Sequence, residues 1–164
     1  MPAQVKGEID SMDEKEYQEY QRKKEYLAGY RKACKKIESL KEQLESLLEI
    51  EQSVRSQQLS DMPKGSNRHQ DLSDLMVKLE DLQAQIADAI MESCKIKLEI
   101  EGALWKMEDP EEARVLRFRY IYFMQCSEIS KAMKYSRTQV WRIHDRAIKN
   151  LKMKHHETFR CVNI

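Results

Sequence analysis

The chain has 164 residues, and its 29 Lys and Arg against 28 Asp and Glu leave a formal net charge of +1, although 35% of the residues are charged. Four glycines and three prolines are too few for a fold with many strands, because the tight turns between strands depend on these residues. The length suits one domain or two, and the composition predicts an all-α protein.

Neither a membrane span nor a secretory signal is expected. The longest uninterrupted apolar stretch is 120–124, whereas a membrane-spanning helix needs roughly 20 apolar residues. Residues 1–10 contain no apolar segment of the kind that a secretory signal carries. We therefore expect a cytoplasmic protein without contact to a membrane.

The segment from about 13 to 58 predicts one long helix, because apolar residues recur there at spacings of three and four. These residues are Tyr26, Tyr30, Ala33, Ile37, Leu40, Leu44, Leu47 and Val54. A polar stretch at 59–70 follows, and Pro63 and Gly65 within it indicate a loop.

The segment from 71 to 108 predicts a second helix, with the sustained heptad pattern of a coiled coil. Its apolar seam is expected to run through Leu72, Leu75, Leu79, Leu82 and Ile86 and to continue at the same spacing. The two helices would form an antiparallel hairpin. Because two helices alone bury little surface, we expect a further partner helix, either from a second copy of the chain in a homodimer or from the C-terminal domain.

Charge divides the chain into two parts of opposite sign. Residues 1–109 hold 17 Lys and Arg and 23 Asp and Glu, a net charge of −6, whereas residues 110–164 hold 12 and 5, a net charge of +7. A basic half favours an anionic partner, most often nucleic acid. We therefore expect an acidic hairpin at 1–108 that oligomerises or binds a partner, a DNA-binding domain at 109–154 and a tail at 155–164.

The basic part begins with a clear helix start. Asp109 is expected to cap a helix that begins at Pro110 and runs to about 121, because Asp suits the cap and Pro the first helical position. A second short helix fits 127–134, and Ser136 opens a capping box before a third helix. Two short helices, a tight turn and a longer basic helix predict a helix-turn-helix.

The third helix has an apolar and a polar face when its residues are placed at 100° intervals. The inward face holds Val140, Ile143, Ala147 and Leu151, with His144 packed near them, and the outward face holds Thr138, Arg142, Asp145, Arg146 and Lys149. Arg137, Thr138 and Arg142 would reach base edges in a major groove. The DNA backbone would be contacted by Gln139, Arg146, Lys149 and Lys152. The alternative is an ordinary solvated charged face.

No catalytic or metal-binding motif is present. The cysteines, which are Cys34, Cys94, Cys126 and Cys161, have neither metal-ligand nor redox spacing. His155 and His156 are adjacent and would point about 100° apart on a helix. The sequence also lacks a P-loop, a nucleophile elbow and an HExxH motif. We expect neither an enzyme nor a bound cofactor or metal.

Two segments of the basic part resemble region 4 of the sigma-70 family of transcription factors. The segment ARVLRFRY at 113–120 resembles the first helix of that region, and YSRTQVWRIHDRAIKNL at 135–151 resembles its recognition helix. The layout of the whole chain is similar to small phage and prophage regulators of Gram-positive bacteria, in which an acidic helical half precedes a sigma region-4-like end. The Gly-Ser-Asn motif at 65–67 ahead of a Leu-rich helix adds to this likeness.

The resemblance implies that Arg137, Thr138 and Arg142 contact double-stranded DNA, and that bacterial RNA polymerase is a partner at the host nucleoid. Thr138 and Arg142 stand where the primary sigma pattern has an acid and a Gln, so the usual −35 promoter element is not the expected target. No region-2-like segment is present, so the protein is not expected to open a promoter alone.

Two functions follow from these features. The first is a sequence-specific transcription regulator of phage type that reads a promoter-like element with the helix at 136–152. The alternative is a phage structural, assembly or DNA-packaging adaptor, because small terminase subunits also join DNA-binding helices to coiled coils.

Overall fold

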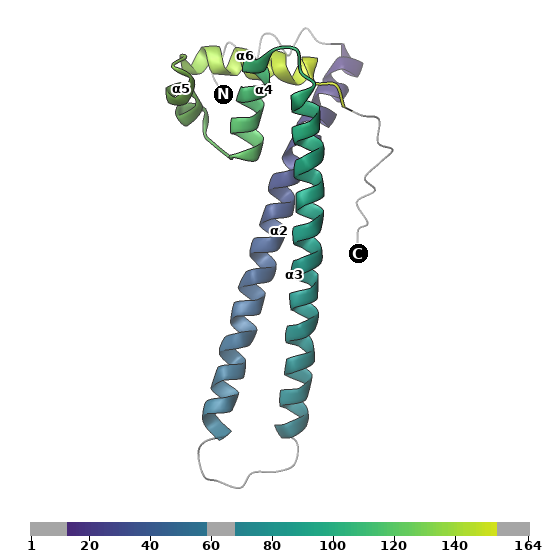
Figure 1. The fold of residues 1–164 in the computed structure, drawn as a ribbon, viewed down its shortest axis with the longest axis vertical. Coiled ribbons are helices and arrows are strands. Elements are labelled where there is room, and N and C mark those ends of the chain that lie inside the picture. The colour runs from purple at the N-terminus through teal and green to yellow at the C-terminus, as the bar shows by residue number, and fades with distance from the viewer. Residues whose placement is uncertain (1–12, 59–67, 154–164) are drawn as a thin grey trace. The chain divides into compact units, whose positions relative to one another are not determined.

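The computed structural model describes residues 13–58 and 68–153 (Figure 1). Within these ranges the chain forms five α-helices and one π-helical turn, and no strand. The prediction of an all-α fold is therefore confirmed. Most of the polar loop, including the Gly-Ser-Asn motif at 65–67, lies outside the described residues, as do Cys161 and the tail at 155–164 with its two histidines.

The first two helices are long and nearly match the predicted segments. Helix α2 is Glu14–Gln58 and helix α3 is Arg68–Trp105. Helix α3 begins and ends three residues earlier than its periodicity suggests. Its last turn tightens, with Lys106 N donating to Ala103 O and Met107 N to Leu104 O, ahead of a proline that disfavours helical geometry in the residue before it. No helix in the described ranges is both long and apolar enough to cross a membrane.

The chain forms two compact units whose limits fall inside these two helices. One unit is residues 32–95, and the other combines the described residues of 13–31 with 96–153. The sequence places a domain boundary at 108 and 109, where the hairpin gives way to the basic helices. In the structure the N-terminal part of α2 and the C-terminal end of α3 instead share a core with those basic helices.

The unit at 32–95 contains the C-terminal part of α2 paired with the N-terminal part of α3. Leu79 and Leu82 of the predicted seam are buried, and Leu40 of α2 is buried as well. Leu72, Leu75 and Ile86 are half-buried. Toward the loop-proximal ends of the helices, Leu72 and Leu75 line an open groove with Ile50 and Val54 of α2. Ser93, the polar member of the heptad pattern, is buried and donates its hydroxyl hydrogen to Ile90 O at 2.8 Å.

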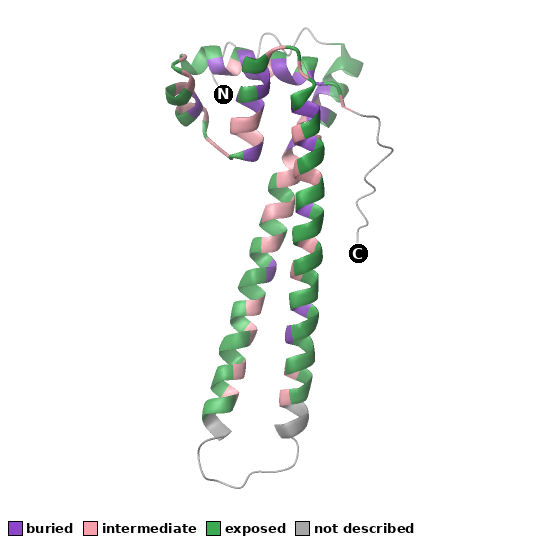
Figure 2. Cartoon of the chain, viewed as in Figure 1, coloured by how far each residue is buried: buried purple, intermediate pink, exposed green. Residues whose placement is uncertain are grey.

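The other unit has the larger core. Figure 2 shows the buried residues gathered where the basic helices meet the ends of the long ones. Leu27 of α2 and Ile100 and Leu104 of α3 are almost fully inaccessible to solvent, and they pack in one cluster with Leu116 and Ile148 from the C-terminal region. Burying a large aliphatic side chain contributes roughly 1.5–3 kcal/mol, so this cluster is the main source of stability for the unit.

His144 is buried in this unit, as its position near the apolar face predicts. Its ring stacks on Tyr120 and meets the edge of Trp141, and its Nε2 lies 3.2 Å from the Tyr120 hydroxyl. Its Nδ1 is buried and has no hydrogen-bond partner among the described residues. Burial lowers the pKa of His144 to about 4, since the charged imidazolium is poorly solvated there.

The depressed pKa of His144 predicts a pH-dependent stability. The unfolded chain binds a proton at this residue near pH 6.5, whereas the folded chain binds it only near pH 4. The folded state therefore keeps its full stability with respect to His144 above pH 6.5, and it loses part of that stability as the pH falls toward 4, because only the unfolded chain takes up the proton in this range. We expect the free energy of unfolding to drop by about 2 kcal/mol between pH 7 and pH 5 from this residue alone.

Urea unfolding of the full chain at a series of pH values measures this loss. In a His144→Phe variant the free energy of unfolding should fall by about 2 kcal/mol less between pH 7 and pH 5, since the titrating group is gone. A variant with an unchanged slope between pH 5 and 7 would contradict the assignment.

Candidate nucleic-acid interface

The basic region folds into a first helix, a π-helical turn and two further helices. These are α4 at Pro110–Leu116, η1 at Arg117–Ile121, α5 at Cys126–Met133 and α6 at Arg137–Asn150. The expectation of one regular helix up to about 121 is wrong, because the helix widens from Arg117 on. There the amide of Tyr122 donates to Arg117 O, five residues back, which is the π-helical pattern.

The chain then reverses at Phe123, which has a positive φ of 57°. A bulky residue rarely adopts this conformation, and neighbouring contacts hold it in place. Met124 N donates to Phe118 O at 2.9 Å and Arg119 donates to Met124 O at 3.1 Å. The Phe123 ring stacks on Tyr30 of α2 with centroids 5.5 Å apart. The π-turn and this reversal set the position at which α5 begins.

Side chains cap both flanking helices of the motif. The Asp109 carboxylate accepts a hydrogen bond from Glu111 N at 2.8 Å at the start of α4. The Ser136 hydroxyl oxygen accepts one from Gln139 N at 3.2 Å at the start of α6. Each cap satisfies an amide that the helix itself leaves without a partner, and together they fix where α4 and α6 begin.

The turn between α5 and α6 is short and tightly bonded. Lys134 adopts a left-handed conformation with φ of 58° and ends α5, and its amide donates to Ser130 O. The amide of Tyr135 donates to the same carbonyl. Tyr135 also donates its hydroxyl hydrogen to Glu111 of α4 at 2.6 Å, and this bond raises the pKa of Tyr135. These hydrogen bonds hold the turn against α5 and against α4.

A small apolar core lies beneath α5 and α6. Val115 of α4, Ile129 of α5 and Val140 and Ile143 of α6 are buried together. The inward positions predicted for α6 are therefore buried, and the predicted outward residues other than Asp145 are exposed to solvent.

The N-terminal half of α6 presents the residues predicted to read DNA bases. Arg137, Thr138, Gln139 and Arg142 are all exposed. Among the described residues, neither the Arg137 nor the Arg142 guanidinium is paired with a carboxylate. This part of the helix is therefore a convex surface with two unpaired guanidinium groups and a hydroxyl between them.

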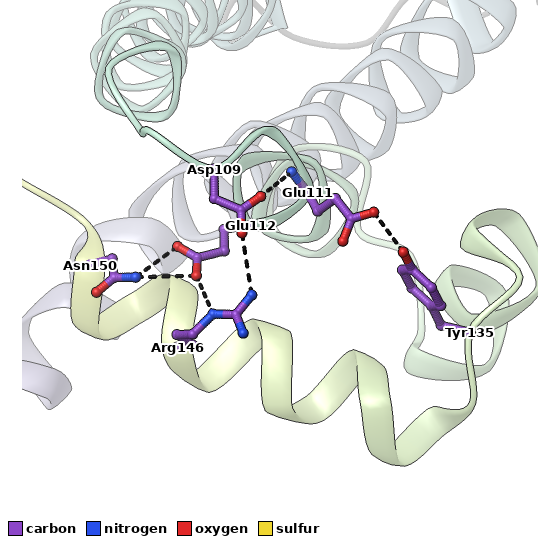
Figure 3. A network of polar contacts seen from close by, with 6 residues as sticks. All are labelled: Asp109, Glu111, Glu112, Tyr135, Arg146 and Asn150. Carbon is purple, nitrogen blue, oxygen red and sulfur yellow. Dashed lines mark hydrogen bonds and ion pairs between the residues drawn. The ribbon is translucent and has the colours of Figure 1, made fainter.

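Arg146 differs from these two arginines. Its Nε donates to the buried carboxylate of Glu112 and its Nη2 lies 3.3 Å from Asp109 (Figure 3). Asn150 donates to the same Glu112 carboxylate at 3.0 Å. The pattern of charges predicts a DNA-backbone contact for Arg146, but the structure engages its guanidinium with α4. Its main contribution is to compensate a carboxylate whose side chain is only 3% exposed.

The two predicted lysine contacts to the DNA backbone lie near the end of α6, at Lys149, and just beyond it, at Lys152. The Lys149 side chain is exposed, and it has no carboxylate partner within the described part of the chain. Lys152 lies 3.3 Å from Glu108, and both side chains are at least 80% exposed. A pair this exposed contributes little stability, so Lys152 stays free to exchange Glu108 for another anion.

Sequence reasoning missed a contact between α6 and the first turns of α2. Tyr20 donates its hydroxyl hydrogen to Asp145, and the buried Lys23 donates to Lys149 O at 2.8 Å. Asp145 was predicted on the outward face, but Tyr20 half-buries it. Burial, together with the hydrogen bond to the acidic Asp145, raises the pKa of Tyr20. Tyr20 and Lys23 lie three residues apart and therefore on one face of α2. This spacing alone does not predict a contact with α6, because the contact depends on the long-range fold.

Metal-binding side chains do not cluster in the part of the chain that the structure describes. In the ranges 13–58 and 68–153, no three His, Cys, Asp or Glu side chains gather as a metal site would require. The accessible chemistry of the region is that of hydrogen-bond donors and positive charge.

The chain belongs to the DUF1492 family, described as proteins of unknown function, which it matches over residues 53–152, more than half of its length. Comparison with curated proteins and with solved structures found no match. The matched range includes the last residues of α2, all of α3 and all of the helices from α4 to α6.

The burial of Glu112 predicts a large difference between two neighbouring acids. Glu112→Ala should lower the free energy of unfolding by about 2–3 kcal/mol, because Arg146 and Asn150 lose the buried partner that joins α6 to α4. Glu108→Ala, which removes the exposed partner of Lys152, should change it by less than about 0.5 kcal/mol. Chemical denaturation of both variants measures the difference, and equal effects would show that the Glu112 network does not hold the helices together.

Proposed function

We propose that this protein is a sequence-specific DNA-binding regulator of transcription, of the phage type, that reads a promoter-like element with α6. The single observation that carries the proposal is the exposed N-terminal half of α6, where Arg137, Thr138 and Arg142 face solvent. The buried Val140 and Ile143 on the other side of the helix fix this orientation.

The chemistry of these side chains suits base edges in a major groove. An α-helix fits that groove, and an Arg guanidinium can donate two parallel hydrogen bonds to O6 and N7 of guanine. The guanidinium groups of Arg137 and Arg142 are available for such bonds, because neither is paired with a carboxylate in the described residues. Thr138 lies between them and can donate to or accept from a base, or contact the methyl group of thymine.

Phosphate contacts would come from fewer residues than the charge pattern suggests. Lys149 and Lys152 are exposed and offer mobile ammonium groups, and Gln139 at the start of the helix offers an amide donor. Arg146 is better regarded as a positioning residue, since it holds α6 against α4 through Glu112. The net charge of +7 at residues 110–164 would still draw the domain toward DNA over a distance.

The resemblance to sigma region 4 supports a link to bacterial RNA polymerase. A protein with such a region and no promoter-melting segment would recruit or modify the host polymerase at the nucleoid rather than replace its sigma factor. A phage packaging adaptor would also bind DNA, but as a ring of many subunits on packaging sites. The experiment below separates these two functions.

The proposal predicts distinct effects for two cations of α6. The full chain is first used to select bound sequences from a random pool of duplex DNA. On the selected site Arg142→Ala should cost about 1–3 kcal/mol of binding free energy and relax the preference at one base position. Lys149→Ala should weaken selected and unrelated sequences alike and reduce the salt dependence of binding, because one phosphate contact is lost.

Lys41→Ala is the matched control, because Lys41 is an exposed cation of α2 in the unit at 32–95. It should leave both affinity and preference unchanged. An Arg142→Ala variant that selects the same motif with the same affinity would contradict reading by α6. A ring of many subunits that covers long stretches of DNA, instead of one short footprint, would favour the packaging function.

A further inference from the structure

Helix α3 carries a second apolar stripe that its partner α2 does not cover. Within the unit at 32–95, this outer stripe consists of Val77, Ala84, Ala87, Met91 and Cys94, at spacings of seven, three, four and three residues, and Glu80 occupies the position between the first two. All of them are exposed, Val77 to 62% and Met91 to 63%. The exposed Met76 and Ile90 flank the stripe, and most of α3 is coloured as exposed in Figure 2.

The outer stripe lies on the side of α3 away from the seam. At 100° per residue, the outer stripe is centred roughly opposite the face that holds the buried Leu79, Leu82 and Ser93. Helix α3 therefore has two apolar faces, whereas an ordinary surface helix has one. One face packs against α2. The other face has the seven-residue period at which a second coiled-coil partner packs.

Charges beside the outer stripe identify the partner and its direction. Asp88 and Lys95 lie seven residues apart along the same edge, and both are exposed. If a second α3 runs antiparallel, centred between Met91 and Cys94, Asp88 faces Lys95 of the other copy, and the two-fold axis repeats the pair. A parallel partner would instead place Glu80, within the outer stripe, against Glu80 of the other copy. The charge pattern thus complements itself only in the antiparallel direction.

We propose that a second copy of this chain packs antiparallel against the outer stripe of α3. Met91 of each copy then lies against Cys94 of the other, and Ala84 and Ala87 allow the two helices to approach closely. The Asp88–Lys95 pairs flank this contact on both sides of the axis. The proposal does not depend on DNA binding, and its test uses no DNA.

Sedimentation equilibrium of the full chain, without DNA and under reducing conditions, tests the contact. The wild-type protein should be a dimer, and Met91→Lys should raise its dissociation constant at least about tenfold, because a charge would be buried in the contact. Gln85→Lys is the matched control, since it adds the same charge to an exposed position of α3 outside the outer stripe. It should leave the dissociation constant unchanged.

Charge reversal tests the direction of the partner. Asp88→Lys and Lys95→Asp should each weaken the dimer, and the double variant should restore it, because the pairs re-form with exchanged signs. These residues are exposed in the single chain, so circular dichroism should show the same helix content in every variant. A monomeric wild-type protein, a dimer insensitive to Met91→Lys, or a double variant no better than the single ones would each overturn the proposal.

Discussion

The buried carboxylate of Glu112 is the interaction on which the proposed reading surface depends. A charged group removed from water needs compensation by donors, and Glu112 finds it in Arg146 and Asn150 on α6. Because these donors lie one turn apart, the contact sets both the rotation and the position of α6 against α4. The same rotation buries Val140 and Ile143 and turns Arg142 to solvent. The exposed face of α6 is therefore a consequence of this pairing.

A second constraint comes from the beginning of α2. Lys23 donates to the carbonyl of Lys149 near the C-terminal end of α6, where helix carbonyls lack partners of their own and a positive charge is favourable. Tyr20 is bound to Asp145 one turn earlier, and Leu27 enters the shared core. The basic helices thus complete their core with residues of α2 that lie more than eighty positions away in the sequence, so the proposed reading region is not a separate module of the C-terminal part.

The sequence alone predicted those features that are set by local periodicity and local chemistry. The long helices follow from apolar spacings, and the positions of Asp109 and Ser136 follow from capping preferences. The π-turn at Arg117 could not be predicted, because no residue pattern distinguishes it from the α-helix that precedes it. The pairing of Arg146 was missed for a different reason. Charge on the outward side of a helix does not show whether an acid from another helix, here Glu112 in the first turn of α4, already compensates it.

The number of cations in a basic helix therefore overstates the number that the fold leaves without a carboxylate partner. Each phosphate contact releases counterions, and the salt dependence of binding measures how many contacts form. Six Lys and Arg lie between 136 and 154, but Arg146 already neutralises the buried Glu112 through its Nε and contacts Asp109 through its Nη2. Removing Glu112 from this partner would leave a buried charge without compensation. The positive charge of α6 thus stabilises the fold at Arg146, and in the proposed function it serves recognition at Arg137 and Arg142, a division that the sequence pattern does not show.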